Sequence, residues 1–420
     1  MSDPELIAAL RRIAEPGRDS TGQDWACRRG YIRFGGLDRR EFSDPIALIS
    51  VSDGKAIVDG RNGSLALNIG GFDLLEASIE AWSPKGETSR KWLCGYLSYE
   101  LCSELEHFSF PVRSKADLPD LFFGLYEAFE NDRANGHPFP ASSSPAGVTS
   151  SPSEEEFRTA VARTVARIYA GEVFQVNVCR KIETSLDPSQ IQPFYSKLLA
   201  LNPASHAAFV QLSPGTAVLS VSPECFLRLD GRQVCSFPIK GTRPRGKTAE
   251  EDARLARELA ESEKDRAELA MIVDVTRNDL GRVCEPGSIR VVSHAQPMRL
   301  PTVHHTFSEV SGCLRRESGV TDLLRAAFPP ASITGAPKIR AIQIAAMEEG
   351  QRRGPCMGAI GWISLDAEPS MEFSVAIRTA VASQGRVWYL AGCGITAESD
   401  PQAELEESSA KAAAFLRALA

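Results

Sequence analysis

Residues 153–178 read SEEEFRTAVARTVARIYAGEVFQVNV, and this stretch decides the class of fold that the sequence predicts. Ser153 followed by Glu156 forms a capping box, which is a common start of a helix. Gly171 predicts the end of that helix, and the alternation over residues 173–178 predicts a strand. Between these signals the apolar side chains recur at helical spacing, at Phe157, Val161, Val165 and Ile168.

Further strands are predicted in the first third of the chain. Residues 46–69 read as short strands that are interrupted by Gly54, Gly60 and Gly63. Residues 95–101 are rich in aromatic side chains and are predicted to lie in the core. Because strands and helices follow one another without the regular alternation of a doubly wound sheet, we predict an α+β fold.

One break in composition divides the chain. Residues 138–153 read PFPASSSPAGVTSSPS, which consists almost entirely of loop-forming residues. We predict a linker or exposed loop there, between an N-terminal subdomain at residues 1–137 and a larger domain at residues 154–420. On the strand after the linker, Gln175 and Asn177 share one face. Two unpaired polar groups in a core would be costly, so this face should border a solvated or functional space.

The bulk composition excludes several classes of protein. The 420 residues carry a formal net charge of −7, which is not the charge of a nucleic-acid-binding protein. No apolar run approaches the ~20 residues that a membrane helix needs, and the N-terminus lacks the pattern of a signal peptide. The ten cysteines form no C-x-x-C pair, which favours free thiols in a reducing cytosol. We therefore expect a cytoplasmic protein that binds neither membrane nor nucleic acid.

Two groups of acidic residues are spaced to share helix faces. Asp265 and Glu268 are three residues apart, and the second group consists of Glu404, Glu407 and Lys411. Taken separately, each group is typical of a solvated helix face. If the fold brings the two faces together, their carboxylates could hold Mg²⁺, which prefers a few carboxylates completed by water and substrate oxygens.

One lysine has a setting that suits covalent chemistry. Residues 238–242 read PIKGT, with Lys240 before a glycine. A lysine in such a loop is usually just solvated, but an uncharged lysine amine can attack carbon and form a covalent intermediate. Neighbouring cations such as Arg243 and Arg245, or a bound metal ion, would favour the uncharged amine.

Several blocks of sequence, taken together, resemble the chorismate-using enzymes over roughly residues 153–420. In order they are GEVFQVN (171–177), SPE (222–224), PIKGT (238–242), KDRAE (264–268), RNDLGRV (277–283), SITGAPK (332–338), IRT (377–379) and GCGI (392–395). PIKGT resembles the signature of component I of aminodeoxychorismate synthases, because anthranilate synthases usually carry alanine in place of the lysine. The resemblance implies two antiparallel sheets packed as a β-sandwich, flanked by helices, with the active site between the sheets.

The resemblance also implies which residues bind the metal ion and perform the reaction. Lys240 would attack C2 of chorismate while Glu224, with a raised pKa, protonates the departing C4 hydroxyl. Ammonia, from a separate glutamine amidotransferase subunit or from solution, would then add at C4 and expel the lysine. The product would be 4-amino-4-deoxychorismate, which leads to 4-aminobenzoate and folate. The Mg²⁺ ligands would be Glu268 and Glu407, supported by Asp265 and Glu404.

The substrate contacts follow from the same resemblance. Arg378 would grip the enolpyruvyl carboxylate, and Gln175 stands where water-adding relatives carry a lysine that activates water. A neutral amide cannot act as that base, so ammonia chemistry is favoured. Trp362 replaces a tyrosine, and His305 matches the family's active-site histidine. The full set of implied substrate contacts is Gln175, Thr334, Trp362, Arg378, Gly392, Gly394 and Lys411.

Three other interpretations are left open. The nearest is component I of anthranilate synthase, in tryptophan synthesis, which Lys240 opposes. The second is a nucleic-acid-binding protein that uses the cations of residues 240–247, which the net charge of −7 opposes. The third is an inactive subunit that only binds an amidotransferase. It is disfavoured by the joint presence of Glu224, Lys240, Glu268, Arg378 and Glu407.

Overall fold

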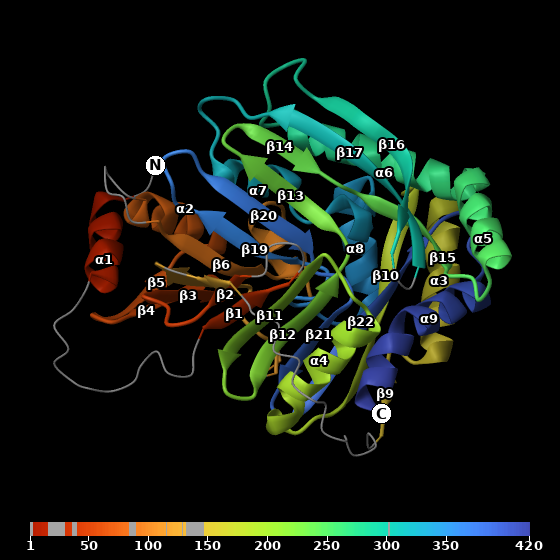
Figure 1. Cartoon of the computed structure of the whole chain (residues 1–420), viewed down its shortest axis with the longest axis horizontal. Helices are drawn as coiled ribbons and strands as arrows, with labels where there is room; N and C mark the ends of the chain where they lie inside the picture. Colours follow the sequence, from red (N-terminus) through yellow and green to blue (C-terminus); the bar gives the residue numbers. More distant parts are fainter. Residues whose placement is uncertain are drawn as a thin grey trace.

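The structure is a computed structural model, and it describes residues 3–15, 30–35, 40–83, 90–114, 116–127, 129–131, 147–300 and 303–420. Within these residues the chain forms two large antiparallel sheets with helices around them (Figure 1). This arrangement confirms the predicted α+β fold.

The strands divide between the two sheets as follows. The first sheet contains β1 (Tyr31–Phe34), β2 (Arg40–Phe42), β8 (Glu130–Asn131), β9 (Thr149–Ser151), β10 (Gln175–Ser185), β11 (His206–Ser213), β12 (Thr216–Ser222), β18 (Gly335–Ala336), β21 (Thr379–Ser383) and β22 (Arg386–Ile395). The second contains β3 (Ala47–Ser52), β4 (Lys55–Gly60), β5 (Gly63–Asn68), β6 (Trp92–Leu97), β7 (Leu121–Tyr126), β13 (Cys225–Asp230), β14 (Gln233–Ser236), β15 (Ile239–Pro244), β16 (Arg290–Arg299), β17 (Val303–Cys313), β19 (Ala359–Ser364) and β20 (Ser370–Val375).

The helices lie between and around these strands. The α-helices are α1 (Pro4–Ala14), α2 (Gly71–Trp82), α3 (Glu154–Tyr169), α4 (Ile191–Leu201), α5 (Ala249–Glu261), α6 (Glu263–Gly281), α7 (Val320–Ala327), α8 (Lys338–Glu349) and α9 (Pro401–Leu419). Short 3₁₀ turns are η1 (Tyr99–Glu104), η2 (Pro188–Gln190) and η3 (Ala331–Ile333). None of the helices in the described residues is long and apolar enough to cross a membrane.

Both sheets combine strands from before and after the predicted linker. In the first sheet the order β18-β10-β22-β21-β12-β11-β1-β2-β8 joins late strands to early ones. In the second, the order β15-β17-β14-β13-β20-β19-β6-β7-β3-β4-β5 does the same. Of the predicted linker 138–153, residues 138–146 lie outside the described residues, and β9 pairs with β10. The division at residues 137 and 154 stays a prediction, although residues 1–137 supply strands to both sheets.

The stretch that opened the sequence argument folds largely as its residues predict. Ser153 and Glu156 form the capping box at the start of α3, and Gly171 follows the helix with a φ of 80°. The strand begins two residues later than predicted, at Gln175. Val176 and Val178 pack in a core between β10, α3 and α8. Phe174 does not share their environment, because it is 73% exposed, while the polar Gln175 is 1% exposed.

The largest core lies between the sheets and joins early and late parts of the chain. It contains apolar side chains of β3, β6 and β7 together with those of β13, β19 and β20, and includes the aromatic residues predicted at 95–101. A second core packs α4 and α9 onto strands β10, β22, β21, β12 and β11 of the first sheet. These layers bring β15, the last strand of the second sheet's order, close to β10 and β22 of the first.

Candidate active site

Lys240 on β15 reaches across to the first sheet. Its Nζ lies 3.4 Å from the position that a Cβ on Gly394 would occupy, and Gln175 Nε2 lies 2.2 Å from the same position. Any side chain at residue 394 would therefore collide with the Gln175 amide. Gly392, on the same strand, is constrained in the same way, because a Cβ there would lie 2.5 Å from the sulfur of Cys179. These two glycines make room for the β10 side chains of Gln175 and Cys179, and the substrate contact implied for both glycines stays a prediction.

The surroundings of Lys240 favour its uncharged form. Burial lowers the pKa of Lys240; the carboxylate of Glu268 opposes this effect and the cation of Lys411 adds to it. An amine that loses its proton more readily is a better nucleophile at neutral pH. The chemistry predicted for PIKGT therefore has a physical basis in this position.

Glu224 lies beside Lys240 and is suited to donate a proton. It precedes β13, is 4% exposed, and its backbone is fixed by hydrogen bonds with the Ser222 hydroxyl (3.2 Å) and the Val375 N–H (3.1 Å). Burial raises the pKa of Glu224 to about 7, and the charge of Lys240 acts in the opposite direction. A carboxyl group with this pKa is about half protonated at neutral pH, which keeps a proton available for a general acid.

The pH dependence of the reaction follows from this pKa. If Glu224 is the proton donor that the resemblance implies, its protonated form is the active one, and kcat/KM for chorismate is expected to fall as the pH rises through about 7. Replacing Glu224 with glutamine should lower kcat by about 10²–10⁴-fold, the usual contribution of a general acid. A pH–rate profile of both proteins checks this. Unchanged activity of the glutamine variant would contradict the assignment.

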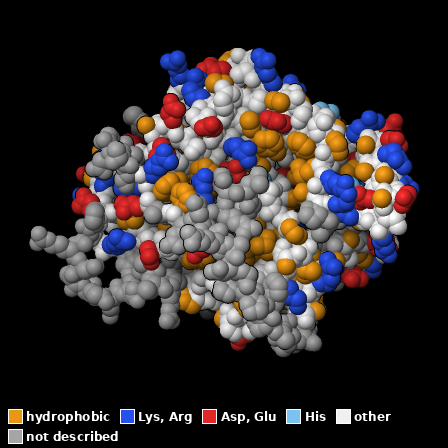
Figure 2. All heavy atoms as spheres, in the orientation of Figure 1, with side chains coloured by type: hydrophobic (Ala, Val, Ile, Leu, Met, Phe, Trp, Pro, Cys, Tyr) orange, Lys and Arg blue, Asp and Glu red, His pale blue; other side chains and the backbone are white. Residues whose placement is uncertain are grey.

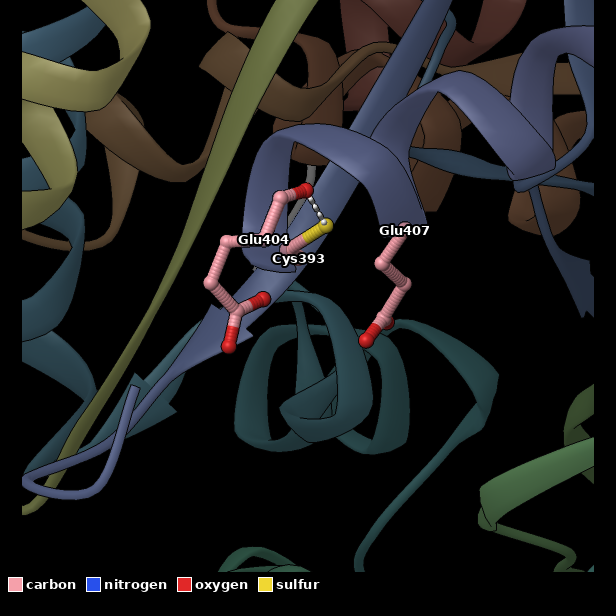
Figure 3. A group of neighbouring side chains, drawn as sticks. All are labelled: Cys393, Glu404 and Glu407. Carbon is pink, nitrogen blue, oxygen red and sulfur yellow. Dashed lines mark hydrogen bonds between the residues drawn. The ribbon is translucent and has the colours of Figure 1, made fainter. Parts of the chain in front are cut away.

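The two acidic helix faces predicted from the sequence do meet. Burial raises the pKa of Glu268 on α6, and the carboxylate of Glu407 on α9 adds to this rise. Glu404 and Glu407 point to the same side of α9, next to Cys393 (Figure 3). Burial raises the pKa of the Cys393 thiol to about 12, so it stays protonated, and it donates to the backbone oxygen of Glu404 (3.3 Å).

This donor set fits Mg²⁺. Carboxylate oxygens are the ligands that Mg²⁺ prefers, and a neutral thiol is not. Glu268 and Glu407 are the residues that would bind the ion. Glu404 accepts a hydrogen bond from the Ser399 hydroxyl (2.6 Å), and Asp265 is paired with Arg243 (2.9 Å). Both of these acids are engaged by neighbours, and so is Glu407, which pairs with Lys411 (2.7 Å). The division into direct and supporting ligands therefore stays a prediction.

A prediction on metal affinity follows. Replacing Glu268 or Glu407 with glutamine removes one negative oxygen ligand each. We expect the Mg²⁺ concentration for half-maximal activity to rise about 10–100-fold. Glu406→Gln, an exposed acid that pairs with Gln402 on the same helix, is the matched control and should leave it unchanged. Equal Mg²⁺ dependence in all three variants would rule out the proposed ligands.

Arg378 and His305 form a second functional pair. The Arg378 side chain lies 3.2 Å from His305 Nε2, and His305 Nδ1 lies 3.0 Å from the backbone oxygen of Gly241. Burial and the Arg378 cation lower the pKa of His305 to about 4, so the ring is neutral and accepts from Arg378. Within the described residues no carboxylate forms an ion pair with Arg378. Its charge is therefore available to a substrate carboxylate.

Lys411 lies beside the predicted metal ligand Glu407. Its Nζ lies 2.7 Å from a Glu407 oxygen and donates to the backbone oxygen of Gly392 (2.8 Å). It thus holds β22 and α9 together, and its charge lowers the pKa values of Lys240 and His305.

Two predicted substrate contacts are placed differently from the rest. Thr334 is 1% exposed, and its hydroxyl donates to backbone oxygens of its own turn, at 3.2 Å to Pro330 and 3.1 Å to Ala331. Trp362 lies on β19, which four strands separate from β15 in the sheet, and its ring contacts Arg40 at 4.6 Å. The structure therefore does not bring Trp362 beside Lys240, and its predicted substrate contact stays a prediction.

Sequence reasoning missed a buried network behind β10. Arg353 is 2% exposed; it donates to both oxygens of Glu349 and to the backbone oxygens of Asn177 and Ile333. Glu349 also accepts from the backbone N–H of Cys179 (2.8 Å). The signal was the four-residue spacing of Glu349 and Arg353, which is far too common to indicate a buried pair.

The basic loop does not form a surface for nucleic acid. Arg243 is paired with Asp265, and Arg245 binds Asp252 through two nitrogens (2.7 and 2.9 Å). Of the cations in that loop, Lys247 is the exposed one. Figure 2 shows positive and negative side chains interspersed on one face of the molecule. Phosphate binding needs unpaired cations in a group, so the arrangement disfavours the nucleic-acid interpretation.

A family model described as chorismate binding enzyme matches residues 37–417. The chain belongs to this family. Among the relatives of this chorismate-binding enzyme is aminodeoxychorismate synthase component 1 of Klebsiella aerogenes, 37% identical over 77% of this chain and 76% of the relative. The Bacillus subtilis protein of the same name is 33% identical over 94% and 90%. Anthranilate synthase component 1 of Streptomyces coelicolor is 41% identical over 67% of this chain, which spans about half (54%) of that relative.

The fold of the chorismate-binding enzymes is also found in solved structures. Anthranilate synthase component I of Streptococcus pneumoniae superposes with a TM-score of 0.76 at 25% identity, over 99% of this chain and 97% of that one. The match supports the architecture of two antiparallel sheets with surrounding helices that the resemblance implied.

Proposed function

We propose that this chorismate-binding enzyme aminates chorismate at C4 and forms 4-amino-4-deoxychorismate, the precursor of 4-aminobenzoate. The observation that carries the proposal is the partly buried Lys240, with its lowered pKa, between Glu224 and the carboxylate of Glu268. A nucleophile, a proton donor and a cluster of acids at one place suit a substitution in which a hydroxyl group leaves and an amine enters.

The reaction proceeds in two substitutions on the ring. The Lys240 amine bonds to C2, both ring double bonds shift, and the C4 hydroxyl takes the proton of Glu224 and leaves as water. Ammonia then bonds to C4 and gives a proton to the Glu224 carboxylate. Both double bonds shift back as the C2–nitrogen bond breaks, which releases the free amine of Lys240. Arg378 holds the enolpyruvyl carboxylate, and His305 orients Arg378 by accepting its hydrogen bond.

Magnesium and a second protein complete the proposed system. Glu268 and Glu407 would hold Mg²⁺, which would supply positive charge to offset that of the ring carboxylate of chorismate. The relatives are named as component 1 of synthases, so we propose that a glutamine amidotransferase subunit supplies the ammonia to this chain.

The competing function is component I of an anthranilate synthase. Its support is the 41% identity to the Streptomyces coelicolor protein and the structural match to the Streptococcus pneumoniae protein. The test is mass spectrometry of the product that forms from chorismate, Mg²⁺ and ammonium. A product that gains an amine and keeps the enolpyruvyl group supports the proposal. Formation of anthranilate would instead assign the chain to tryptophan synthesis.

A further inference from the structure

Two motifs that received no role from the sequence meet in the interior. Asp279 of RNDLGRV lies on α6 and Lys338 of SITGAPK begins α8. Lys338 Nζ donates to Asp279 Oδ2 (2.7 Å) and to the backbone oxygens of Ala327 (2.9 Å) and Pro329 (3.0 Å). The side chains of Asp279 and Lys338 are 10% and 15% exposed. A lysine with all three donors used in this way fixes the loop between α7 and α8 onto α6.

Asp279 lines a small cavity that Glu224 also lines. The cavity has a volume of about 20 Å³, enough for about one water molecule. Its polar side chains are those of Glu224, Ser236, Thr276, Asp279 and Ser332. The buried hydroxyl of Ser332 interacts with the Glu224 carboxyl and acts against the rise of its pKa. Part of the opposite wall is the loop that Lys338 holds, because Ala327 and Pro330 line the cavity as well.

Three elements place charged groups around Glu224 and its cavity. Lys240 faces it from β15, Asp279 lines the same cavity from α6, and Lys338 neutralises Asp279 from α8. The adjacent Cys225 thiol is neutral, because burial raises its pKa. The wall contributed by η3 and β20 is uncharged. A single unpaired charge at the Asp279–Lys338 position would therefore act on Glu224 through a poorly hydrated space.

We propose that Asp279 and Lys338 form a positioning pair for Glu224: together they fix the wall of this cavity and keep it electrically neutral, so that Glu224 is protonated when chorismate binds. This inference rests on the proposed role of Glu224 as the proton donor. Neither residue of the pair touches the substrate in this account. Their effect on the reaction passes through the carboxyl group of Glu224 alone.

The test separates the two charges. Asp279→Asn leaves the Lys338 cation unpaired, which favours ionised Glu224, so the alkaline limb of kcat/KM should move down by about one pH unit. Lys338→Met leaves a carboxylate unpaired and should move the limb up. The double variant Asp279→Asn/Lys338→Met is neutral again, and its limb should return to that of the wild type.

A purely structural role would give a different result. It would lower the stability or kcat of all three variants and leave the position of the limb unchanged, or move it in one direction in both single variants. Either outcome overturns the inference. Thermal unfolding of each variant shows whether it is folded before its profile is used.

A second readout does not depend on catalysis. The infrared band of the protonated Glu224 carboxyl, assigned by its loss in Glu224→Gln, can be titrated in each variant. If the titration midpoint of the band shifts in opposite directions in the two single variants while Glu224→Gln keeps full activity, the proposed function fails and the effect of the pair on Glu224 is supported. If the midpoint is the same in all variants while Glu224→Gln is inactive, the inference fails and the proposed function stands.

Discussion

Replacing Lys240 with alanine is expected to lower the rate of 4-amino-4-deoxychorismate formation by about a thousandfold or more, because the covalent route is lost with the amine. The KM for chorismate should change much less, since the carboxylates of the substrate are held by Arg378 and the metal ion. Steady-state kinetics with ammonium as the nitrogen source measure both quantities. A loss in KM alone would mean that Lys240 only binds the substrate.

Two further variants separate charge from nucleophilicity at this position. Lys240→Arg keeps a cation, but guanidinium does not lose its proton in proteins, so this variant should be as inactive as alanine. Lys247→Ala removes an exposed lysine of the same loop and should be fully active. If Lys240→Arg retained substantial activity, a covalent lysine intermediate would be excluded.

The second large effect is expected on stability. Arg353→Met should lower the free energy of unfolding by about 3–5 kcal/mol, because it leaves the buried Glu349 carboxylate without its charged partner. It also removes the donors to the backbone of Asn177 and Ile333. Urea denaturation followed by fluorescence measures the change.

An exposed ion pair provides the matched control for this loss. Arg254 pairs with Glu258 four residues along α5, and both side chains are about half exposed. Arg254→Met should cost about 0.5 kcal/mol or less. A similar small loss for Arg353→Met would show that the buried network does not stabilise the fold.

The local structure was readable from the sequence where the signals are local. The capping box at Ser153 fixes the start of α3, and the glycines between residues 46 and 69 mark the turns between β3, β4 and β5. The pairing of strands could not be predicted from the sequence. Nor could the approach of β15 to β10 in the other sheet, because both depend on packing across the whole chain. Two sheets were expected only because the sequence resembles a family.

The site was predictable as residue types but not as contacts. The spacing of Asp265 and Glu268 put both acids on one helix face, yet only the structure pairs Asp265 with Arg243. The close approach of Gln175 to Gly394 could not be predicted, because Gln175 lies on a strand more than 200 residues earlier. Asp279 and Lys338 were visible in their motifs, but their pairing joins α6 to α8 and leaves no trace in sequence spacing.

The most direct test of the central claim is the amount of pyruvate released per chorismate consumed, with purified protein, Mg²⁺ and ammonium. Amination at C4 through Lys240 retains the enolpyruvyl group, so the account predicts that chorismate disappears without release of pyruvate. Release of one pyruvate for each chorismate, with fluorescent anthranilate as the co-product, would contradict it.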